Sequence, residues 1–127
     1  MPAPSRVQID DVEFDAQRAD YEALATFRCT LRRFLAWSER NAREAGLEPQ
    51  QHQMMLAISG LPPEQRPTIR VLAERLQIRH HTAVELADRL AANGLVVRGR
   101  TSPDQREVVI SLTVEGELRL APLVRGI

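Results

Sequence analysis

The chain has 127 residues, a length typical of one domain, and 43% of them are hydrophobic, enough for a buried core. Its 17 basic and 17 acidic side chains cancel, so total charge does not indicate a nucleic-acid or membrane partner. The longest apolar run, residues 54–58, is far too short to span a bilayer, and the N-terminus lacks the features of a secretory signal. The single Cys29 excludes an internal disulfide, so we expect a protein of the reducing cytoplasm.

The N-terminal part is predicted to be an arm followed by a long helix. Residues 1–14 show no helical spacing of their apolar positions, and we expect a flexible or strand-like arm. A helix is predicted over about residues 16–45, ended by Gly46. Its apolar stripe comprises Tyr21, Leu24, Phe27, Leu31, Phe34 or Leu35, and Ser38, broadened by Ala25 and Trp37. A helix of about 30 residues outruns a domain of this size, so its stripe predicts a second copy as partner.

A second helix is predicted to begin at Glu48-Pro49, because proline suits the first turn of a helix. We expect it to carry Met55, Leu56 and Ile58 into the core. The proline-rich residues 60–67 then predict an extended loop.

Residues 68–93 predict two helices joined by a tight corner. Thr68 is a good N-cap, and the helix that it begins has one apolar side made of Ile69, Leu72, Ala73 and Leu76. The next helix is predicted from about His80 to Asn93, where Asn93-Gly94 tolerates the positive φ of a helix end. Its apolar positions at i, i+3, i+4 and i+7 are Ala83, Leu86, Ala87 and Leu90. The opposite positions therefore face outward: His81, Val84, Glu85 and Asp88.

Two β-branched runs follow, Leu95-Val96-Val97 and Val108-Val109-Ile110, and the turn residues 102–106 join them. This pattern predicts a hairpin. Its protruding loop carries three guanidiniums that suit the negative potential of a narrow minor groove: Arg98, Arg100 and Arg106. Thr113 is predicted to cap a last helix. The fold class is thus mainly α with a small β-hairpin wing, a winged helix-turn-helix flanked by N- and C-terminal helices.

Charge is distributed unevenly along the chain. Residues 66–106 hold 8 arginines against 4 acids, residues 1–65 hold 7 against 10, and residues 107–127 hold 2 against 3. A positive segment on a neutral chain is typical of a DNA-facing module. All the basic residues are arginine, which either favours bidentate contacts to phosphate and guanine or reflects a GC-rich genome.

One ordered set of residues resembles the multiple antibiotic resistance regulator, or MarR, family of bacterial transcription factors. The set is Leu76-Gln77-Ile78, Thr82, Asp88-Arg89-Leu90, Asn93-Gly94-Leu95-Val96, Arg98, Asp104-x-Arg106, Leu112-Thr113 and Gly116. The resemblance implies a homodimer on pseudo-palindromic double-stranded DNA, with the second helix in the major groove and Arg106 in the minor groove. Asp104 would brace the wing through an ion pair. A small aromatic or phenolic effector would release the DNA, and the protein would act as a repressor.

These inferences assign the chain as follows. Residues 1–14 are the arm, residues 15–47 and 114–127 are dimerisation helices, and residues 48–113 are the winged helix-turn-helix. The predicted DNA-binding residues are Arg79, His80, His81, Thr82, Val84, Glu85, Arg98, Arg100, Ser102, Asp104 and Arg106. The predicted effector pocket comprises Phe27, Leu31, Trp37, His52 and Met55, although apolar residues at such spacing also suit a core.

The chain departs from the family pattern at the start of the reading helix. Arg79 replaces a Ser-like cap, which costs about 1 kcal/mol. Val84 and Glu85 replace a hydroxyl residue and a basic residue; valine can touch a thymine methyl, and a carboxylate can accept from cytosine but repels phosphate. The alternative function is therefore a winged-helix module for protein-protein interaction that has lost most of its DNA affinity.

Other kinds of site find little support in the sequence. Cys29 lies among Arg28, Arg32 and Arg33, which would favour a reactive thiol, but we expect a buried and inert residue. His80 and His81 point about 100° apart on a helix and cannot chelate a metal together. No phosphate-binding loop or catalytic constellation is found in the sequence, so we expect neither an enzyme nor a cofactor.

Overall fold

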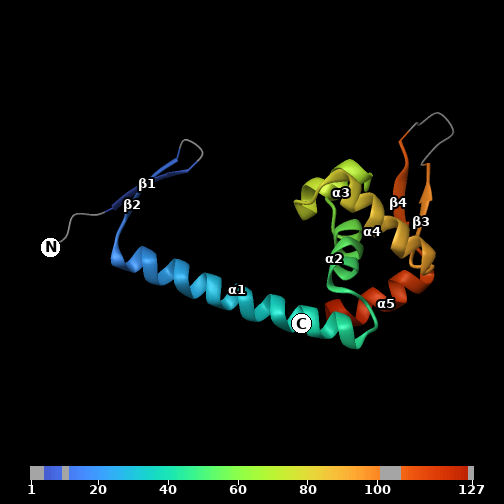
Figure 1. The fold of residues 1–127 in the computed structure, drawn as a ribbon, viewed down its shortest axis with the longest axis horizontal. Coiled ribbons are helices and arrows are strands. Elements are labelled where there is room, and N and C mark those ends of the chain that lie inside the picture. The colour runs from blue at the N-terminus through green and yellow to red at the C-terminus, as the bar shows by residue number, and fades with distance from the viewer. Residues whose placement is uncertain (1–4, 10–11, 101–106, 126–127) are drawn as a thin grey trace. The chain divides into compact units, whose positions relative to one another are not determined.

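A computed structural model describes the backbone of residues 5–9, 12–100 and 107–125, and the side chains from residue 17 onward within those ranges. Figure 1 shows the order of the elements. They are β1 (Ser5–Ile9), β2 (Val12–Ala16), α1 (Arg18–Glu44), α2 (Pro49–Ser59), α3 (Ile69–Leu76), α4 (His80–Ala92), β3 (Val96–Gly99), β4 (Val109–Leu112) and α5 (Val114–Arg125). The chain forms two compact units, residues 1–37 and 38–127. Among the described helices, none is both long and apolar enough to cross a membrane.

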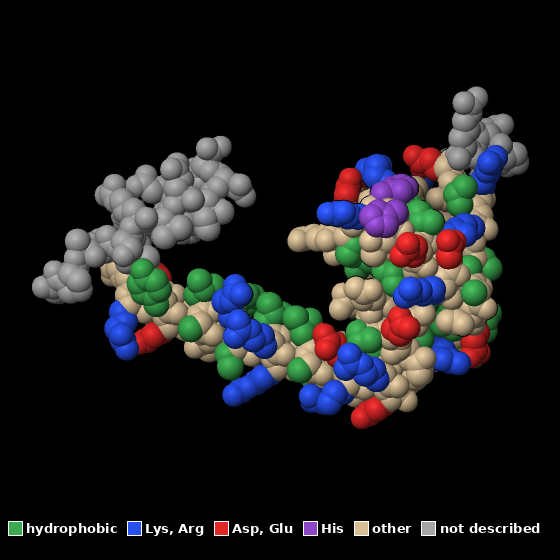
Figure 2. Space-filling model, in the orientation of Figure 1, with side chains coloured by type: hydrophobic (Ala, Val, Ile, Leu, Met, Phe, Trp, Pro, Cys, Tyr) green, Lys and Arg blue, Asp and Glu red, His purple; other side chains and the backbone are tan. Residues whose placement is uncertain are grey.

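The first unit contains a hairpin and most of α1. β1 and β2 pair antiparallel, with Val7 opposite Phe14, so the strand-like alternative describes the arm better than a flexible one. α1 matches the predicted helix to within two residues at its start and one at its end. None of residues 17–36 is buried, and Figure 2 shows hydrophobic side chains along α1. The large exposed ones are Tyr21, Leu24, Phe27, Leu31, Phe34 and Leu35, which belong to the predicted stripe.

The second unit holds the core, and α2 lies at its centre. α2 packs against α3, α4, β4 and α5. Figure 1 shows α3 and α4 beside the β3–β4 hairpin, which confirms the predicted winged helix-turn-helix order. The four predicted inner residues of α4 are all buried, at 3% exposure or less. The core comprises Ala42, Leu47, Met54, Met55, Leu72, Ala73, Ala83, Leu86, Ala87, Leu90, Leu95, Val96, Ile110 and Leu120.

Local signals place the ends of these helices. The Glu48 backbone N–H donates to Gln51 Oε1 at 3.2 Å as half of a capping box that begins α2. Thr68 Oγ1 accepts from the Val71 N–H at 3.2 Å, as a predicted N-cap should. Gln77 has a left-handed φ of 55° and makes the tight corner before α4, while Gly94 has a φ of 72° and turns the chain into β3.

One core prediction for α2 is wrong. Leu56 is 44% exposed, and Met54 occupies the core in its place with no exposed surface. The buried residues Gln51, Met54 and Met55 fall at i, i+3 and i+4, which is one face of a helix. Residues 54–58 are all apolar, so their sequence alone does not fix which side of the helix faces inward.

Thr113 joins the hairpin to α5. Its Oγ1 accepts from the Gly116 N–H at 3.0 Å, which confirms the predicted cap, and it donates to the Gly94 carbonyl at 2.7 Å. Its backbone N–H donates to the Leu95 carbonyl at 3.0 Å. The start of α5 is therefore fixed against the turn that precedes β3.

Gly116→Ala is expected to lower the free energy of unfolding. A methyl group there would stand 2.2 Å from the Leu95 carbonyl oxygen, which cannot retreat without straining its bond from Thr113. We expect a decrease of about 1–3 kcal/mol, measured by urea unfolding. Gly99→Ala is the control, because nothing lies within 4 Å of the added carbon. Equal stability of the two variants would contradict this packing.

Candidate nucleic-acid interface

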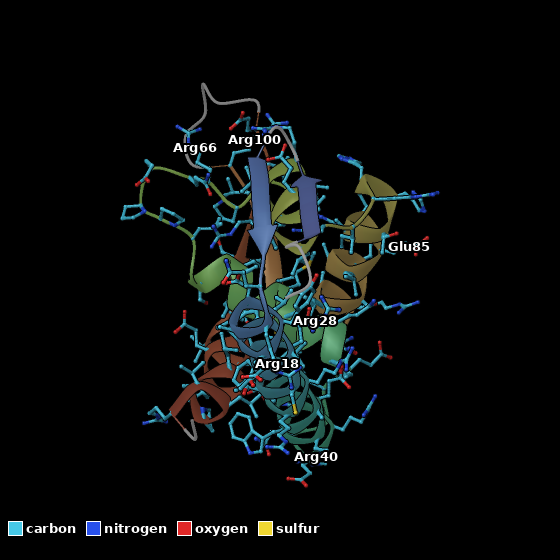
Figure 3. All side chains as sticks on the ribbon, turned by 90° about the vertical axis from the view of Figure 1, so that its left-hand side faces the viewer. Arg18, Arg28, Arg40, Arg66, Glu85 and Arg100 are labelled. Carbon is cyan, nitrogen blue, oxygen red and sulfur yellow. The ribbon has the colours of Figure 1, made fainter. Side chains whose placement is uncertain are left out.

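The outward face of α4 is the first part of the candidate interface. His80, His81 and Glu85 are exposed, while Thr82 and Val84 are half-buried. Figure 3 shows Glu85 pointing outward from α4, and Figure 2 shows the histidines gathered on the surface near charged side chains of both signs. Because the core holds the opposite side of the helix, these residues are presented to whatever approaches α4.

The N-terminus of α4 lacks a side-chain cap, as the sequence predicted. Arg79 occupies the N-cap position with extended backbone angles and makes no capping hydrogen bond through its side chain. The first amides of a helix carry partial positive charge and attract anions. The exposed guanidinium of Arg79 adds a full charge at the same point. This end of the helix is therefore chemically suited to a phosphate group.

Arg98 has a role that its place in the sequence does not reveal. Its guanidinium donates to the Asp88 carboxylate of α4, and it therefore ties β3 to that helix. The two residues are ten positions apart across a turn, so no helical or strand spacing relates them. The predicted contact of Arg98 with DNA stays a prediction, and its observed partner is Asp88.

The wing carries the remaining predicted contacts. Arg100 is exposed just after β3, whereas Ser102, Asp104 and Arg106 lie outside the described residues. Figure 3 shows Arg100 and Arg66 at the same end of the second unit. Arg66, from the loop before α3, was not predicted as a site residue. It pairs with Glu107, just before β4, with 3.5 Å between Nη1 and Oε2.

The predicted effector residues fall in different units. Phe27 and Leu31 are exposed on α1, and the half-buried Trp37 stacks obliquely on Phe34 with ring centroids 6.1 Å apart. His52 and Met55 are buried in the core of the second unit. The residues on α1 and the residues on α2 thus belong to different compact units, and the effector pocket stays a prediction.

The expectation that Cys29 is a buried, inert residue is wrong, because Cys29 is exposed on α1. Burial was inferred from the usual habit of free cysteines. None of the described residues 17–36 is buried, so the apolar character of Cys29 does not lead to burial in this part of α1.

His52 is buried in α2, and its titration is displaced. It is 7% exposed, and burial lowers its pKa from the ordinary value of 6.5 because the charged imidazolium is poorly solvated there. The folded chain thus favours a neutral imidazole in α2.

Acidification is expected to destabilise the fold through His52. Because its pKa is lower in the folded than in the unfolded chain, unfolding takes up a proton as the pH falls below 6.5. The stability is fully present above that value and is lost as the pH drops toward the lowered pKa. Urea unfolding at about pH 7.5 and about pH 5.5 measures the difference in the free energy of unfolding between the two pH values. His52→Gln should reduce this difference. An unchanged difference in that variant, matching the exposed control His81→Gln, would contradict the assignment.

Comparisons with known proteins place this geometry in a family. A model described as the MarR family matches residues 45–107. The Bacillus subtilis HTH-type transcriptional repressor MdtR is 31% identical over 55 residues, which are 43% of this chain and 36% of that protein. The chain thus spans about a third of that relative.

Solved structures agree with this family match. A multiple antibiotic-resistance repressor from Listeria monocytogenes has 25% identity and a TM-score of 0.65, with 82% of this chain and 69% of that one covered. A further MarR family transcription regulator has 25% identity and a TM-score of 0.68, with 84% and 68% covered. These similarities confirm the winged helix-turn-helix fold class predicted from the sequence.

Proposed function

The chain belongs to the MarR family, and we propose that it is a transcription regulator that binds duplex DNA through α4 and the β3–β4 wing. The observation that carries the proposal is the pairing of an outward polar helix face with an arginine-bearing hairpin on one rigid core. α4 is of a size that enters a major groove, and its N-terminal residues approach the bases. Arg100 and the predicted Arg106 follow the adjoining minor groove.

A homodimer gives this mechanism its geometry. The exposed apolar stripe of α1 suits a second copy, because burial of its large side chains removes unfavourable contact with water. Two copies related by a two-fold axis present their α4 helices about 34 Å apart, in successive major grooves of a pseudo-palindrome. Binding at a promoter then blocks RNA polymerase, and the protein acts as a repressor in the cytoplasm.

Release of DNA is proposed to follow binding of a small aromatic or phenolic effector. Such a molecule acts by binding more tightly to a dimer whose α4 helices do not match the spacing of the grooves. The predicted pocket residues on α1 supply aromatic and apolar surface for it, including Phe27 and Trp37.

The alternative function, a winged-helix interaction module, is favoured by Glu85. This exposed carboxylate lies on the face of α4 that would approach phosphates and repels them. A chain that retains the fold but fails to bind duplex DNA at low salt would support this alternative.

DNA binding is expected to weaken steeply with salt, because arginines that contact phosphates release counterions. Fluorescence anisotropy with a labelled random duplex should show affinity falling by about a hundredfold or more between about 50 and 200 mM salt. In a plot of the logarithm of the binding constant against the logarithm of the salt concentration, Arg100→Ala should make the negative slope shallower by about one for each phosphate that its guanidinium neutralises. Arg125→Ala at the end of α5 is the matched control and should leave the slope unchanged. A flat salt response in the unsubstituted chain would reject DNA binding.

Sedimentation at micromolar concentration is expected to show a dimer held by the α1 stripe. The double variant Leu24→Glu with Phe27→Glu places two charges on the stripe and should raise the dimer dissociation constant by about a hundredfold or more. Thr26 is exposed on the opposite side of the same helix, so the control variant Thr26→Glu should leave the dimer intact. A monomeric unsubstituted chain, or equal effects of both variants, would remove the stripe from the interface.

A further inference from the structure

We propose that Arg66 and Glu107 are positioning residues that clamp the loop end of the wing, just before β4, to the loop before α3, and so hold the wing in the position that DNA binding requires. This inference rests on the proposed function for its consequence, but its structural part can be tested without DNA.

The clamp is made of an ion pair and a backbone bond. Arg66 Nη1 lies 3.5 Å from Glu107 Oε2, and the neighbouring Pro67 carbonyl accepts from the Ile110 N–H of β4 at 2.9 Å. The Arg66 carbonyl in turn accepts from the Thr68 N–H at 2.8 Å, directly before α3 begins. Proline fixes its own φ, so the segment that bears the clamp is stiff. The outer edge of β4 is thereby tied to the start of the helix-turn-helix.

A second tie holds the other strand at the same level. Arg98 of β3 pairs with Asp88 of α4, and Arg98 is also the residue directly opposite Ile110 in the hairpin. One rung of the wing is thus attached on one side to α4 and on the other to the loop before α3. Because an isolated two-stranded hairpin is only marginally stable in water, ties at both edges decide where its end points.

The surroundings of Arg66 provide an internal comparison. It lines a polar pocket of about 280 Å³ together with Thr68, Arg70, Glu74 and Glu107. A second ion pair borders the same pocket, with Arg70 Nη1 3.4 Å from Glu74 Oε1. That pair joins two positions within α3, four residues apart, and so does not connect α3 to another element. Both pairs are solvent-exposed, so neither is expected to contribute much to global stability.

Removal of the Glu107 carboxylate should change the DNA affinity in opposite directions, depending on whether Glu107 acts as a clamp or only through its charge. A carboxylate near bound DNA repels phosphates, so its removal should tighten binding if charge alone matters. Removal of a clamp frees the loop end of the wing, and the entropic cost of ordering that end is then paid when DNA binds. Binding should then weaken although the chain has become more positive.

The experiment compares Glu107→Gln with the matched control Glu74→Gln by anisotropy on one duplex at fixed salt. Each variant removes one carboxylate from the same pocket, so Glu107→Gln breaks the ion pair with Arg66 and Glu74→Gln breaks the ion pair with Arg70. We expect Glu107→Gln to weaken binding about three- to tenfold over the two wings of a dimer, and Glu74→Gln to bind as well as or better than the unsubstituted chain. The exchange Arg66→Glu with Glu107→Arg should recover affinity to within about twofold, whereas Arg66→Glu alone should not.

Hydrogen exchange gives the readout that does not need DNA. Amides of residues 107–112 should exchange faster in Glu107→Gln and return to the original rate in the exchanged double variant, while Glu74→Gln leaves them unchanged. Unaltered exchange, or Glu107→Gln binding at least as tightly as Glu74→Gln, would overturn the clamp. If the unsubstituted chain bound no duplex, the proposed function would fail, and the exchange rates would still decide whether the clamp exists.

Discussion

The burial of one side of α4 is the constraint on which the rest of the candidate interface depends. Ala83, Leu86, Ala87 and Leu90 all lie in the core, and rotation of the helix by even one residue position would bring polar side chains inward. The outward direction of His81 and Glu85 is therefore fixed by packing rather than by any contact that they make themselves. A face that is fixed before a partner arrives loses little freedom on binding.

The same core fixes the wing only indirectly, through short connections. Gly94 turns the chain into β3, and Thr113 bonds to that turn while it caps α5. Buried Val96 and Ile110 hold the base of the hairpin, but residues nearer its end leave the core. Polar contacts add to this packing at the rung of Arg98 and Ile110, where Arg98 pairs with Asp88 and the Ile110 N–H donates to the Pro67 carbonyl. The hairpin is therefore held by apolar burial at its base and by an ion pair and a backbone hydrogen bond at its edges.

The sequence predicted what depends on local pattern and missed what depends on distant neighbours. Periodicity and capping residues placed α3, α4 and the hairpin almost to the residue, because each is governed by contacts within a few positions. The phase of α2 was misjudged at Leu56, where an unbroken apolar run has no polar side to orient it. The partners Asp88 and Glu107 could not be found from spacing, since the fold alone brings them to Arg98 and Arg66.

These pairings also change what the arginine surplus of residues 66–106 means. Four of its arginines face carboxylates, and Arg66 and Arg89 take theirs from outside the segment, at Glu107 and Glu48, the latter 3.6 Å away. The local excess of 4 counted along the sequence is therefore partly neutralised in space. Arginines engaged in this way position helices and strands. Arg79 and Arg100 are exposed at the start of α4 and just after β3, and they are the arginines proposed to contact phosphate. In that proposal, the positive potential is concentrated on the surface that faces the DNA grooves.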